Sequence, residues 1–188
     1  MNFIRPLILA SNSPRRKQLL QEAGFTFTVK TQQVTEDYPA EMPLISVAKY
    51  LAEKKAMAFN HVLEDEIVIA ADTVVIQDNT FLGKPKDAQE AENMLRLMSG
   101  KMHRVITGMC LLDRNKKISF DAATEVYFKN LTTEEINFYI EHYKPYDKAG
   151  AYGIQEWIGL IGIEKIVGSY YNVVGLPVQK LYEELWKF

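Results

Sequence analysis

The sequence predicts an α/β fold in which a mixed, twisted sheet is flanked by helices. Short apolar segments with strand character recur along the chain, from Leu7–Ala10 near its beginning to Leu160–Val167 near its end. Segments with the periodicity of amphipathic helices lie between them. Strands and helices that alternate in this way are typical of the α/β class.

The expected strands are either apolar throughout or alternate between apolar and polar residues. Ile67–Ile76 is almost entirely apolar, which is usual for a strand covered on both faces. Asp78 and Asn79 form a turn signal after it, so Thr80–Leu82 is expected to return as the second strand of a hairpin. The other expected strands are Leu7–Ala10, Phe25–Val29, Val105–Leu112, Ile118–Phe128 and Leu160–Val167.

The expected helices begin at residues that favour helix starts. Ser13 is a suitable N-cap and Pro14 a suitable first residue for a helix that ends at Gly24. Capping-box pairs and prolines mark the remaining starts: Asp87 with Glu90, Thr132 with Glu135, Pro43, and Pro177. The glycine-rich segment Ala149–Gly175 is expected to contain one strand, Leu160–Val167.

The composition fits a single domain over residues 1–188. Hydrophobic residues make up 47% and charged residues 24%, which supports a packed core and argues against disorder. The net charge of -2 argues against a nucleic-acid partner. Cys110 is the single cysteine, so an intrachain disulfide is excluded and a reducing compartment is compatible. The sequence shows neither a signal-peptide pattern nor an apolar stretch long enough to cross a membrane, so we expect a cytoplasmic protein.

A basic cluster stands where the first expected strand gives way to the first expected helix. The run Ser11-Asn12-Ser13-Pro14 is followed directly by Arg15, Arg16 and Lys17. Cations in a first helical turn oppose the helix dipole, at a cost of about 0.3–1 kcal/mol each. Free backbone N–H groups and guanidinium groups would together suit a phosphate, so the cluster indicates an anion site. A solvated basic turn is the alternative.

Acidic residues supply the second unusual feature. Asp72 lies inside the apolar segment Ile67–Ile76, where an unpaired carboxylate would cost several kcal/mol. A divalent cation such as Mg²⁺ or Mn²⁺ would satisfy it and suit phosphoryl chemistry. The alternatives are a turn cap or a pair with an arginine. Glu36 could share the metal or belong to a solvated loop.

Two lysines also stand in unusual places. Lys55 lies on the apolar face of the helix that Pro43 opens, where its stem could pack while the ammonium reaches water. Lys84 lies between Gly83 and Pro85, in a turn that could aim it at a phosphate or leave it exposed.

Six segments of the chain together resemble the Maf family, also called septum formation inhibitor Maf proteins. They follow one another in the family's order and extend over nearly the whole sequence: Leu9–Arg16, Leu51–Ala56, Ala71–Val75, Gly83–Pro85, Asp147–Gln155 and Asn172–Pro177. The resemblance implies an inosine-triphosphatase-like fold of two lobes with a central cleft, often as a homodimer. It also implies a nucleoside triphosphate pyrophosphatase that uses a divalent cation.

The resemblance further implies roles for individual residues. Asp72 falls on the position of the proton acceptor, and Glu36 on an acidic position that would join Asp72 at the metal. The expected triphosphate-binding residues are Ser11, Arg15, Arg16, Lys55 and Lys84. The expected determinants of base preference are Arg15, Thr73 and Gln155.

The string Gly150-Ala151-Tyr152-Gly153-Ile154-Gln155 resembles the branch that hydrolyses dTTP and UTP, and modified pyrimidine nucleotides are compatible with it. The expected reaction yields the nucleoside monophosphate and pyrophosphate. A sister activity on 7-methyl-GTP and a nucleotide-binding regulator of cell division with little catalysis are the competing hypotheses.

Overall fold

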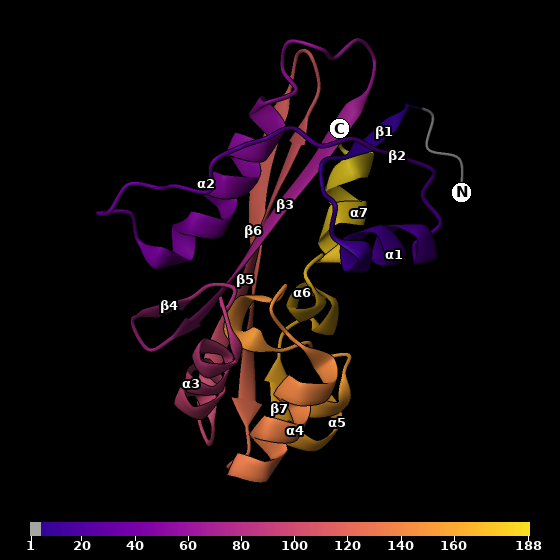
Figure 1. Ribbon diagram of the computed structural model, residues 1–188. Helices are drawn as coiled ribbons and strands as arrows, with labels where there is room; N and C mark the ends of the chain where they lie inside the picture. The colour runs from indigo at the N-terminus through magenta and orange to yellow at the C-terminus, as the bar shows by residue number, and fades with distance from the viewer. Residues whose placement is uncertain (1–4) are drawn as a thin grey trace. The chain divides into compact units, whose positions relative to one another are not determined.

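The structure of the protein is a computed structural model, and it describes residues 5–188 (Figure 1). Its strands are β1 (Leu7–Leu9), β2 (Thr28–Val29), β3 (Ile67–Gln77), β4 (Thr80–Leu82), β5 (Met102–Leu112), β6 (Lys117–Phe128) and β7 (Ile163–Val167). Its α-helices are α1 (Pro14–Glu22), α2 (Leu44–Met57), α3 (Ala88–Met98), α4 (Thr133–Tyr143), α5 (Trp157–Gly162), α6 (Tyr170–Val174) and α7 (Val178–Trp186). A short 3₁₀ turn covers Ala149–Ala151.

The strands form one mixed sheet, which confirms the predicted α/β class. Their order is β2-β1-β3-β5-β6-β7, and β4 pairs with β3. β1 runs parallel to both β2 and β3, whereas β4 pairs antiparallel with β3 and β7 antiparallel with β6. The predicted hairpin after Ile76 is present, and its turn places Asp78 at a φ of 54°. β2 is shorter than predicted because only Thr28 and Val29 pair with β1.

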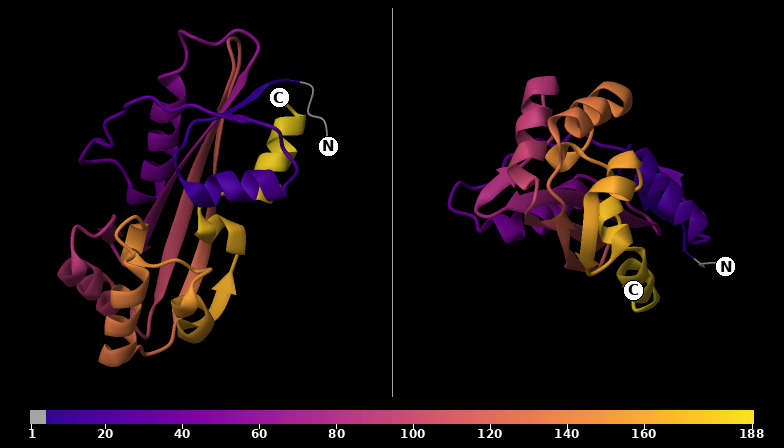
Figure 2. Two further views of the ribbon diagram at one scale, coloured as in Figure 1. Left: turned by 45° about the vertical axis from the view of Figure 1, so that its right-hand side comes forward. Right: turned by 90° about the horizontal axis from the view of Figure 1, so that it is seen from below.

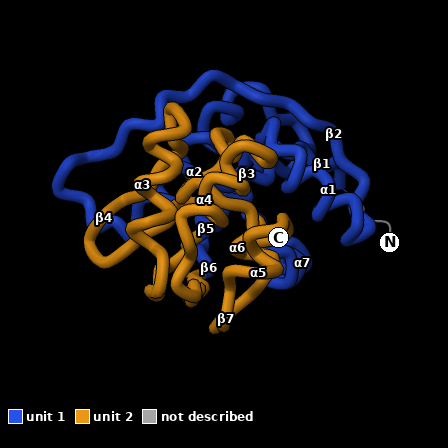
Figure 3. The backbone as a smooth tube through the Cα atoms, turned by 60° about the horizontal axis from the view of Figure 1, so that its bottom comes forward, with its two compact units in different colours: residues 1–72, 107–122, 175–188 blue, residues 73–106, 123–174 orange. Residues whose placement is uncertain are grey.

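The chain divides into two compact units (Figure 3). Unit 1 contains residues 1–72, 107–122 and 175–188, and unit 2 contains residues 73–106 and 123–174. Three strands, β3, β5 and β6, contribute residues to both units. The first unit therefore carries the predicted basic cluster and Asp72, and the second carries the glycine-rich segment.

In unit 1, helices cover both faces of the strands. α2 lies on one side of β1 and β3, and α1 and α7 lie on the other (Figure 1). Ala52 and Ala56 of α2 are fully buried against Ile8, Val68 and Cys110. Alternate residues of the same strands, such as Leu9 and Ile69, are fully buried as well. A strand buried on both faces explains why Ile67–Ile76 is almost continuously apolar.

In unit 2, two helices that lie side by side shape the core (Figure 2). α3 contributes Leu95 and Met98, and α4 contributes Ile136 and Tyr139, all essentially buried. The capping box that opens α4 is present in full, because Thr132 and Glu135 each accept a hydrogen bond from the other's backbone N–H. This prediction is confirmed.

The capping box predicted for α3 is only half correct. The Asp87 carboxylate accepts from the Glu90 backbone N–H at 2.8 Å, as an N-cap should. The Glu90 carboxylate, however, accepts from the backbone N–H of Lys86 at 2.7 Å. The second hydrogen bond of the box is thus shifted by one residue, from the N–H of Asp87 to that of Lys86. The Asp87 cap is unaffected, and a different backbone N–H is satisfied.

The glycine-rich segment contains more helix than predicted. α5 and α6 are helices of six and five residues, and they flank β7. The predicted strand Leu160–Val167 is present from Ile163 onward, and its first three residues belong to α5 instead. Within residues 5–188, none of the helices combines the length and the apolar character needed to span a membrane.

Candidate active site

The basic cluster begins with a well-ordered helix start. Ser13 is the N-cap of α1, and its hydroxyl accepts from the Arg16 backbone N–H at 3.4 Å. Pro14 is the first helical residue, where a missing N–H does no harm. The first turn contains no acidic side chain, so Arg15, Arg16 and Lys17 meet the positive end of the helix dipole without compensation from that turn.

Arg16 is held in place by groups outside its own helix. Its Nε donates to the carbonyl oxygen of Gly175 at 2.8 Å, and its Nη1 donates to the Ser11 hydroxyl at 3.4 Å. Burial lowers the pKa of Arg16 from its ordinary value, and the charge of Asp72 acts in the opposite direction. The guanidinium remains charged at neutral pH, because arginine does not deprotonate in proteins. A fixed cation therefore stands within electrostatic range of Asp72.

A single ammonium group joins the two predicted acidic residues. Lys55 Nζ donates to Asp72 Oδ1 at 2.5 Å and to Glu36 Oε1 at 2.7 Å. The exposed fractions of the side chains are 13% for Asp72 and 20% for Lys55, so this pair is largely shielded from water. Glu36 is more open, at 55%. The proposed alternative of a snorkelling Lys55 is wrong, since its ammonium binds carboxylates rather than water alone.

The sequence produces this convergence through two regular elements. Asp72 lies in the middle of β3, where alternate side chains point to opposite faces of the sheet. Lys55 lies in the last turn of α2, one residue before Ala56, which is buried in the core that α2 forms with the strands. The loop between β2 and α2 supplies Glu36. Lys55 is thus a hydrogen-bonded partner of Asp72, and Arg16 also interacts with Asp72 through its charge.

The two carboxylates are chemically suited to a divalent cation. Glu36 and Asp72 both turn an oxygen toward the same positive centre, which here is an ammonium group. Carboxylate oxygens are the ligands that Mg²⁺ and Mn²⁺ prefer. Among residues 5–188, no group of three or more His, Cys, Asp or Glu side chains could hold a metal. A cation at Glu36 and Asp72 would thus need further oxygen ligands from substrate and water.

Three of the predicted site residues belong to unit 2. Thr73 follows Asp72 in β3 and is half-buried, and Lys84 is exposed in the turn after β4. Gln155 is exposed and lines a pocket of about 320 Å³, together with Ile163, Lys165 and Tyr170 among others. The structure joins Ser11, Arg16, Glu36, Lys55 and Asp72 in one network of contacts and charges within unit 1.

The Gln155 amide lies close to the backbone of Gly153. A Cβ atom on Gly153 would stand 2.9 Å from Gln155 Nε2 and 2.9 Å from the carboxyl carbon of Glu156. A side chain at residue 153 would therefore require the ends of these two side chains to move. Behind it, the Tyr139 hydroxyl accepts from the Gly153 N–H at 2.9 Å and donates to Glu156.

Sequence reasoning missed several residues that lie beside the site residues. Gly175 was assigned no role, yet it orients Arg16 through its carbonyl group, which no side-chain pattern reveals. Lys54 and Asp37, which form an ion pair at 2.6 Å, were also missed. Their signal in the sequence was present, since each is the direct neighbour of a predicted site residue.

The family model and the related sequences both point to one family. The model of the family described as "Maf-like protein" matches residues 6–188. A protein of Cytophaga hutchinsonii named "dTTP/UTP pyrophosphatase" is 51% identical over 96% of this chain and 83% of its own. Proteins of the same name from Phocaeicola vulgatus and Parabacteroides distasonis are 51% and 47% identical, and each is covered to 95%. Among solved structures, the Staphylococcus aureus Ham1 protein matches with a TM-score of 0.49 and 12% identity, over 66% of this chain and 72% of that one.

Proposed function

The chain belongs to the Maf family, and on this basis we propose that it is a nucleoside triphosphate pyrophosphatase that hydrolyses dTTP and UTP. The products are the nucleoside monophosphate and pyrophosphate. The observation that carries the proposal is the convergence of Asp72 and Glu36 on Lys55 within electrostatic range of Arg16, in a chain about half identical to proteins named for this activity.

Binding of the triphosphate is assigned to the cations and the start of α1. The N-terminal N–H groups of a helix and its dipole favour an anion, and the first turn of α1 adds Arg15 and Arg16. Ser11 is buried beside them and fixes Arg16. Lys55 and Lys84 complete the proposed set. Gly175 commits Arg16 Nε, so the guanidinium is oriented before substrate arrives, which reduces the entropy cost of binding.

The proposed chemistry is an attack of water on the α-phosphorus. The bond between the α-phosphorus and the bridging oxygen breaks, and that oxygen leaves with pyrophosphate. Asp72 orients the attacking water and accepts its proton, the role of a general base. Lys55 and Arg16 offset the negative charge that develops on the phosphate oxygens, and most catalysis of phosphoryl transfer arises from such positioning and electrostatics.

A divalent cation, Mg²⁺ or Mn²⁺, belongs to this proposal. Glu36 and Asp72 would hold it, with oxygens of the triphosphate as further ligands. Its chemical contribution would be to neutralise negative charge on the phosphates as the leaving group departs. A carboxylate that binds the cation would give up its contact with the Lys55 ammonium group. Lys55 would then bind a phosphate oxygen in place of at least one carboxylate.

Base preference is assigned to Gln155, with Arg15 and Thr73 as further determinants. A glutamine amide offers one acceptor and donors, which matches the carbonyl and N–H groups of uracil and thymine. Cytosine replaces one carbonyl by an amino group and would leave a mismatched polar pair, worth about 1–3 kcal/mol. The exposed amide at the edge of the unit 2 pocket supports this role.

The remaining parts of the proposal concern the protein as a whole. The family match over residues 6–188 supports a single Maf-like domain composed of the two units. We place this enzyme in the cytoplasm, where nucleotide substrates are available, and assign it neither a nucleic-acid nor a membrane partner. A homodimer is compatible with the family.

A substrate panel tests the proposal directly. We expect wild-type enzyme with Mg²⁺ or Mn²⁺ to release pyrophosphate from UTP and dTTP with a higher kcat/KM than from CTP, GTP or 7-methyl-GTP. In the Gln155→Ala variant, the ratio of kcat/KM for UTP to kcat/KM for CTP should fall by roughly tenfold. A tenfold change corresponds to about 1.4 kcal/mol, which lies within the expected cost of a mismatched polar pair. Preference for 7-methyl-GTP would reassign the substrate, and binding without turnover would favour a regulatory protein.

A further inference from the structure

The position of Glu36 depends on side-chain contacts rather than on a regular element. Residues 30–39 have neither helical nor strand structure, and Glu36 lies within them. Its side chain is 55% exposed, so packing contributes little to its placement. A loop carboxylate of this kind would sample several positions unless its neighbours were fixed, and ordering it at the moment of binding would cost entropy.

The two neighbours of Glu36 are fixed by one lysine. Lys54 Nζ donates to the Asp37 carboxylate at 2.6 Å and to the Thr35 hydroxyl at 3.0 Å. It also donates to the backbone carbonyl of Asp37 at 3.3 Å. The residues immediately before and after Glu36 therefore share a single ammonium group, and one of the contacts holds the main chain itself.

Two consecutive lysines of α2 bind different residues of the loop. Lys54 donates to Thr35 and Asp37, whereas Lys55 donates to Glu36 and to Asp72 in β3. Neighbouring residues of a helix point about 100° apart, so the two ammonium groups can meet different side chains of the same short segment. The Lys54 side chain is 28% exposed, which places it below the loop rather than in open solvent.

The ion pair of Lys54 and Asp37 acts on the loop. Lys54 Nζ lies 2.6 Å from Asp37 Oδ1, and its other hydrogen bonds go to the Thr35 hydroxyl and to the Asp37 carbonyl oxygen. All three acceptors belong to the residues that flank Glu36, so the contribution of the pair to the site passes through the loop.

We propose that Lys54 and Asp37 form a positioning pair that holds the loop so that Glu36 presents its carboxylate to the divalent cation. This inference rests on the proposed function, because it takes Glu36 to be a metal ligand. Lys54 acts through the backbone at residues 35–37 and is not a catalytic residue. Partners that orient a ligand without contacting the metal commonly change metal affinity by about 10–100-fold.

The experiment is a titration of the protein with Mn²⁺ alone, in which electron paramagnetic resonance measures the concentration of free Mn²⁺. Lys54→Met and Asp37→Asn should each weaken Mn²⁺ binding by about tenfold, the lower end of the range for indirect partners. For Lys54→Met, the direction of the change in Mn²⁺ affinity distinguishes positioning from simple electrostatics. Removing a positive charge near a cation site should tighten binding by simple electrostatics, so weaker binding indicates lost positioning.

The matched control lies on the same helix. Lys49 pairs with Asp121 at 3.6 Å, and Lys49→Met removes another partly exposed lysine–aspartate pair of α2 that lies away from the loop. It should leave the Kd for Mn²⁺ unchanged within about twofold, as expected for a surface pair. Thermal unfolding of every variant checks that the fold survives.

A second background separates this inference from the proposed function. Glu36→Gln should weaken Mn²⁺ binding, and adding Lys54→Met to it should cause no further loss, because the lysine acts only through Glu36. If Glu36→Gln binds Mn²⁺ as wild type does, the metal role of Glu36 and this inference both fail. If Glu36→Gln weakens binding while Lys54→Met leaves it unchanged or tightens it, the positioning pair alone is refuted.

Discussion

At the scale of single residues, Asp72 combines an apolar surrounding with a strong cation partner. Val74 and Ala71 beside it in β3 are almost fully buried, whereas 13% of the Asp72 side chain is exposed. The carboxylate is thus shielded from bulk water yet open on the side of Lys55. An arrangement of this kind costs free energy unless the charges are paired, and its location in the middle of an otherwise apolar strand marks a functional position.

Replacing Asp72 by Asn tests its role as the proton acceptor. The amide keeps the shape but cannot take a proton, so kcat for pyrophosphate release should fall by roughly 10²-fold or more. The fold should persist, because a neutral amide is less costly to shield than a carboxylate. A pyrophosphate-release assay and a thermal melt measure the two effects. Asp121→Asn, which alters an exposed carboxylate of unit 1, should remain active, and an active Asp72→Asn enzyme would remove Asp72 from the mechanism.

The sequence revealed those site residues that violate a local rule. Asp72 in an apolar strand, Lys55 on an apolar helix face and arginines at a helix start are each unfavourable alone, and the structure explains Asp72 and Lys55 by joining them. Glu36 violates no rule, because an acidic residue in a loop is ordinary. Its contact with Lys55 brings together positions 19 residues apart through a loop without periodicity, which local patterns cannot predict.

At the scale of elements, the helix that carries Lys54 and Lys55 lies unusually close to the sheet. A Cβ atom on Gly108 of β5 would stand 2.2 Å from the backbone nitrogen of Lys49 and 2.3 Å from the carbonyl carbon of Ala48. Both obstructing atoms are backbone, so neither can rotate away. The absence of a side chain at residue 108 is therefore what allows α2 to pack at this depth.

Gly108→Ala should consequently destabilise the protein. Overpacking of a close contact costs about 1–3 kcal/mol, and here the helix as a whole must shift. Urea unfolding measures the change, and the displaced α2 should also reduce catalytic activity through Lys55. Gly83→Ala is the matched control, because its Cβ would meet only the Phe81 side chain, at 3.3 Å. Equal stability of the two variants would show that α2 can retreat without cost.

The same kind of contact explains why sequence patterns missed α5. Gly159 sits in this helix because a Cβ there would lie 1.8 Å from the carbonyl oxygen of Ile154. Glycine is read from sequence as a helix breaker, yet here it serves a close approach between two backbone segments. With six residues in α5 and five in α6, neither helix is long enough to show a periodic apolar face. The longer helices and strands, which show a periodic or continuous apolar pattern, were predicted.

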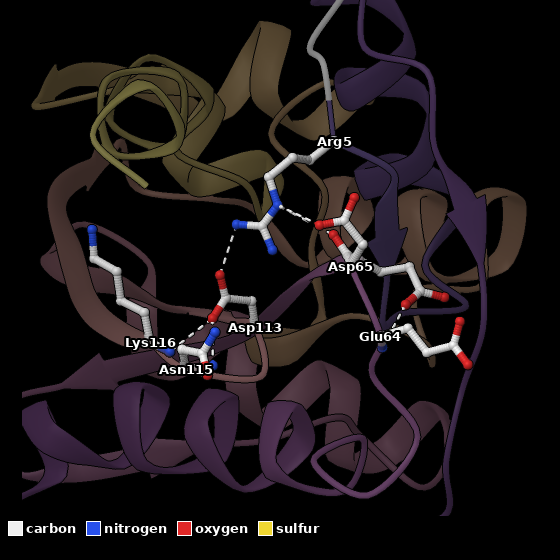
Figure 4. A network of polar contacts seen from close by, with 7 residues as sticks. Arg5, Glu64, Asp65, Asp113, Asn115 and Lys116 are labelled. Carbon is white, nitrogen blue, oxygen red and sulfur yellow. Dashed lines mark hydrogen bonds and ion pairs between the residues drawn. The ribbon is translucent and has the colours of Figure 1, made fainter.

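At the scale of the whole molecule, a buried carboxylate connects segments distant in sequence (Figure 4). Asp113, in the turn between β5 and β6, accepts from Arg5 Nη1 at 2.7 Å and from the backbone N–H groups of Asn115 and Lys116. Burial raises the pKa of Asp113, but these hydrogen bonds outweigh it and hold the pKa below the ordinary value of 3.8. The folded state therefore favours the charged form.

The stability of the protein should depend on pH through this group. A lowered folded pKa means that the stabilisation is complete above the unfolded pKa and is lost as the pH falls through the folded value. Asp113→Asn should reduce the free energy of unfolding by about 1–3 kcal/mol at pH 7, and the gap to wild type should narrow below about pH 4. Urea denaturation across pH gives both numbers. Asp65→Asn removes an exposed partner of the same arginine and should change the free energy of unfolding little. If the difference in stability between Asp113→Asn and wild type widened in acid, the role assigned to Asp113 would be contradicted.

The central claim is that water attacks the α-phosphorus, and the measurement that tests it most directly is hydrolysis of UTP in water enriched in ¹⁸O. Attack at the α-phosphorus places one ¹⁸O atom in UMP and none in pyrophosphate, and mass spectrometry of the two products distinguishes them. The account predicts labelled UMP and unlabelled pyrophosphate, with turnover abolished by a metal chelator. Label in pyrophosphate, or UDP and orthophosphate as the first products, would contradict it.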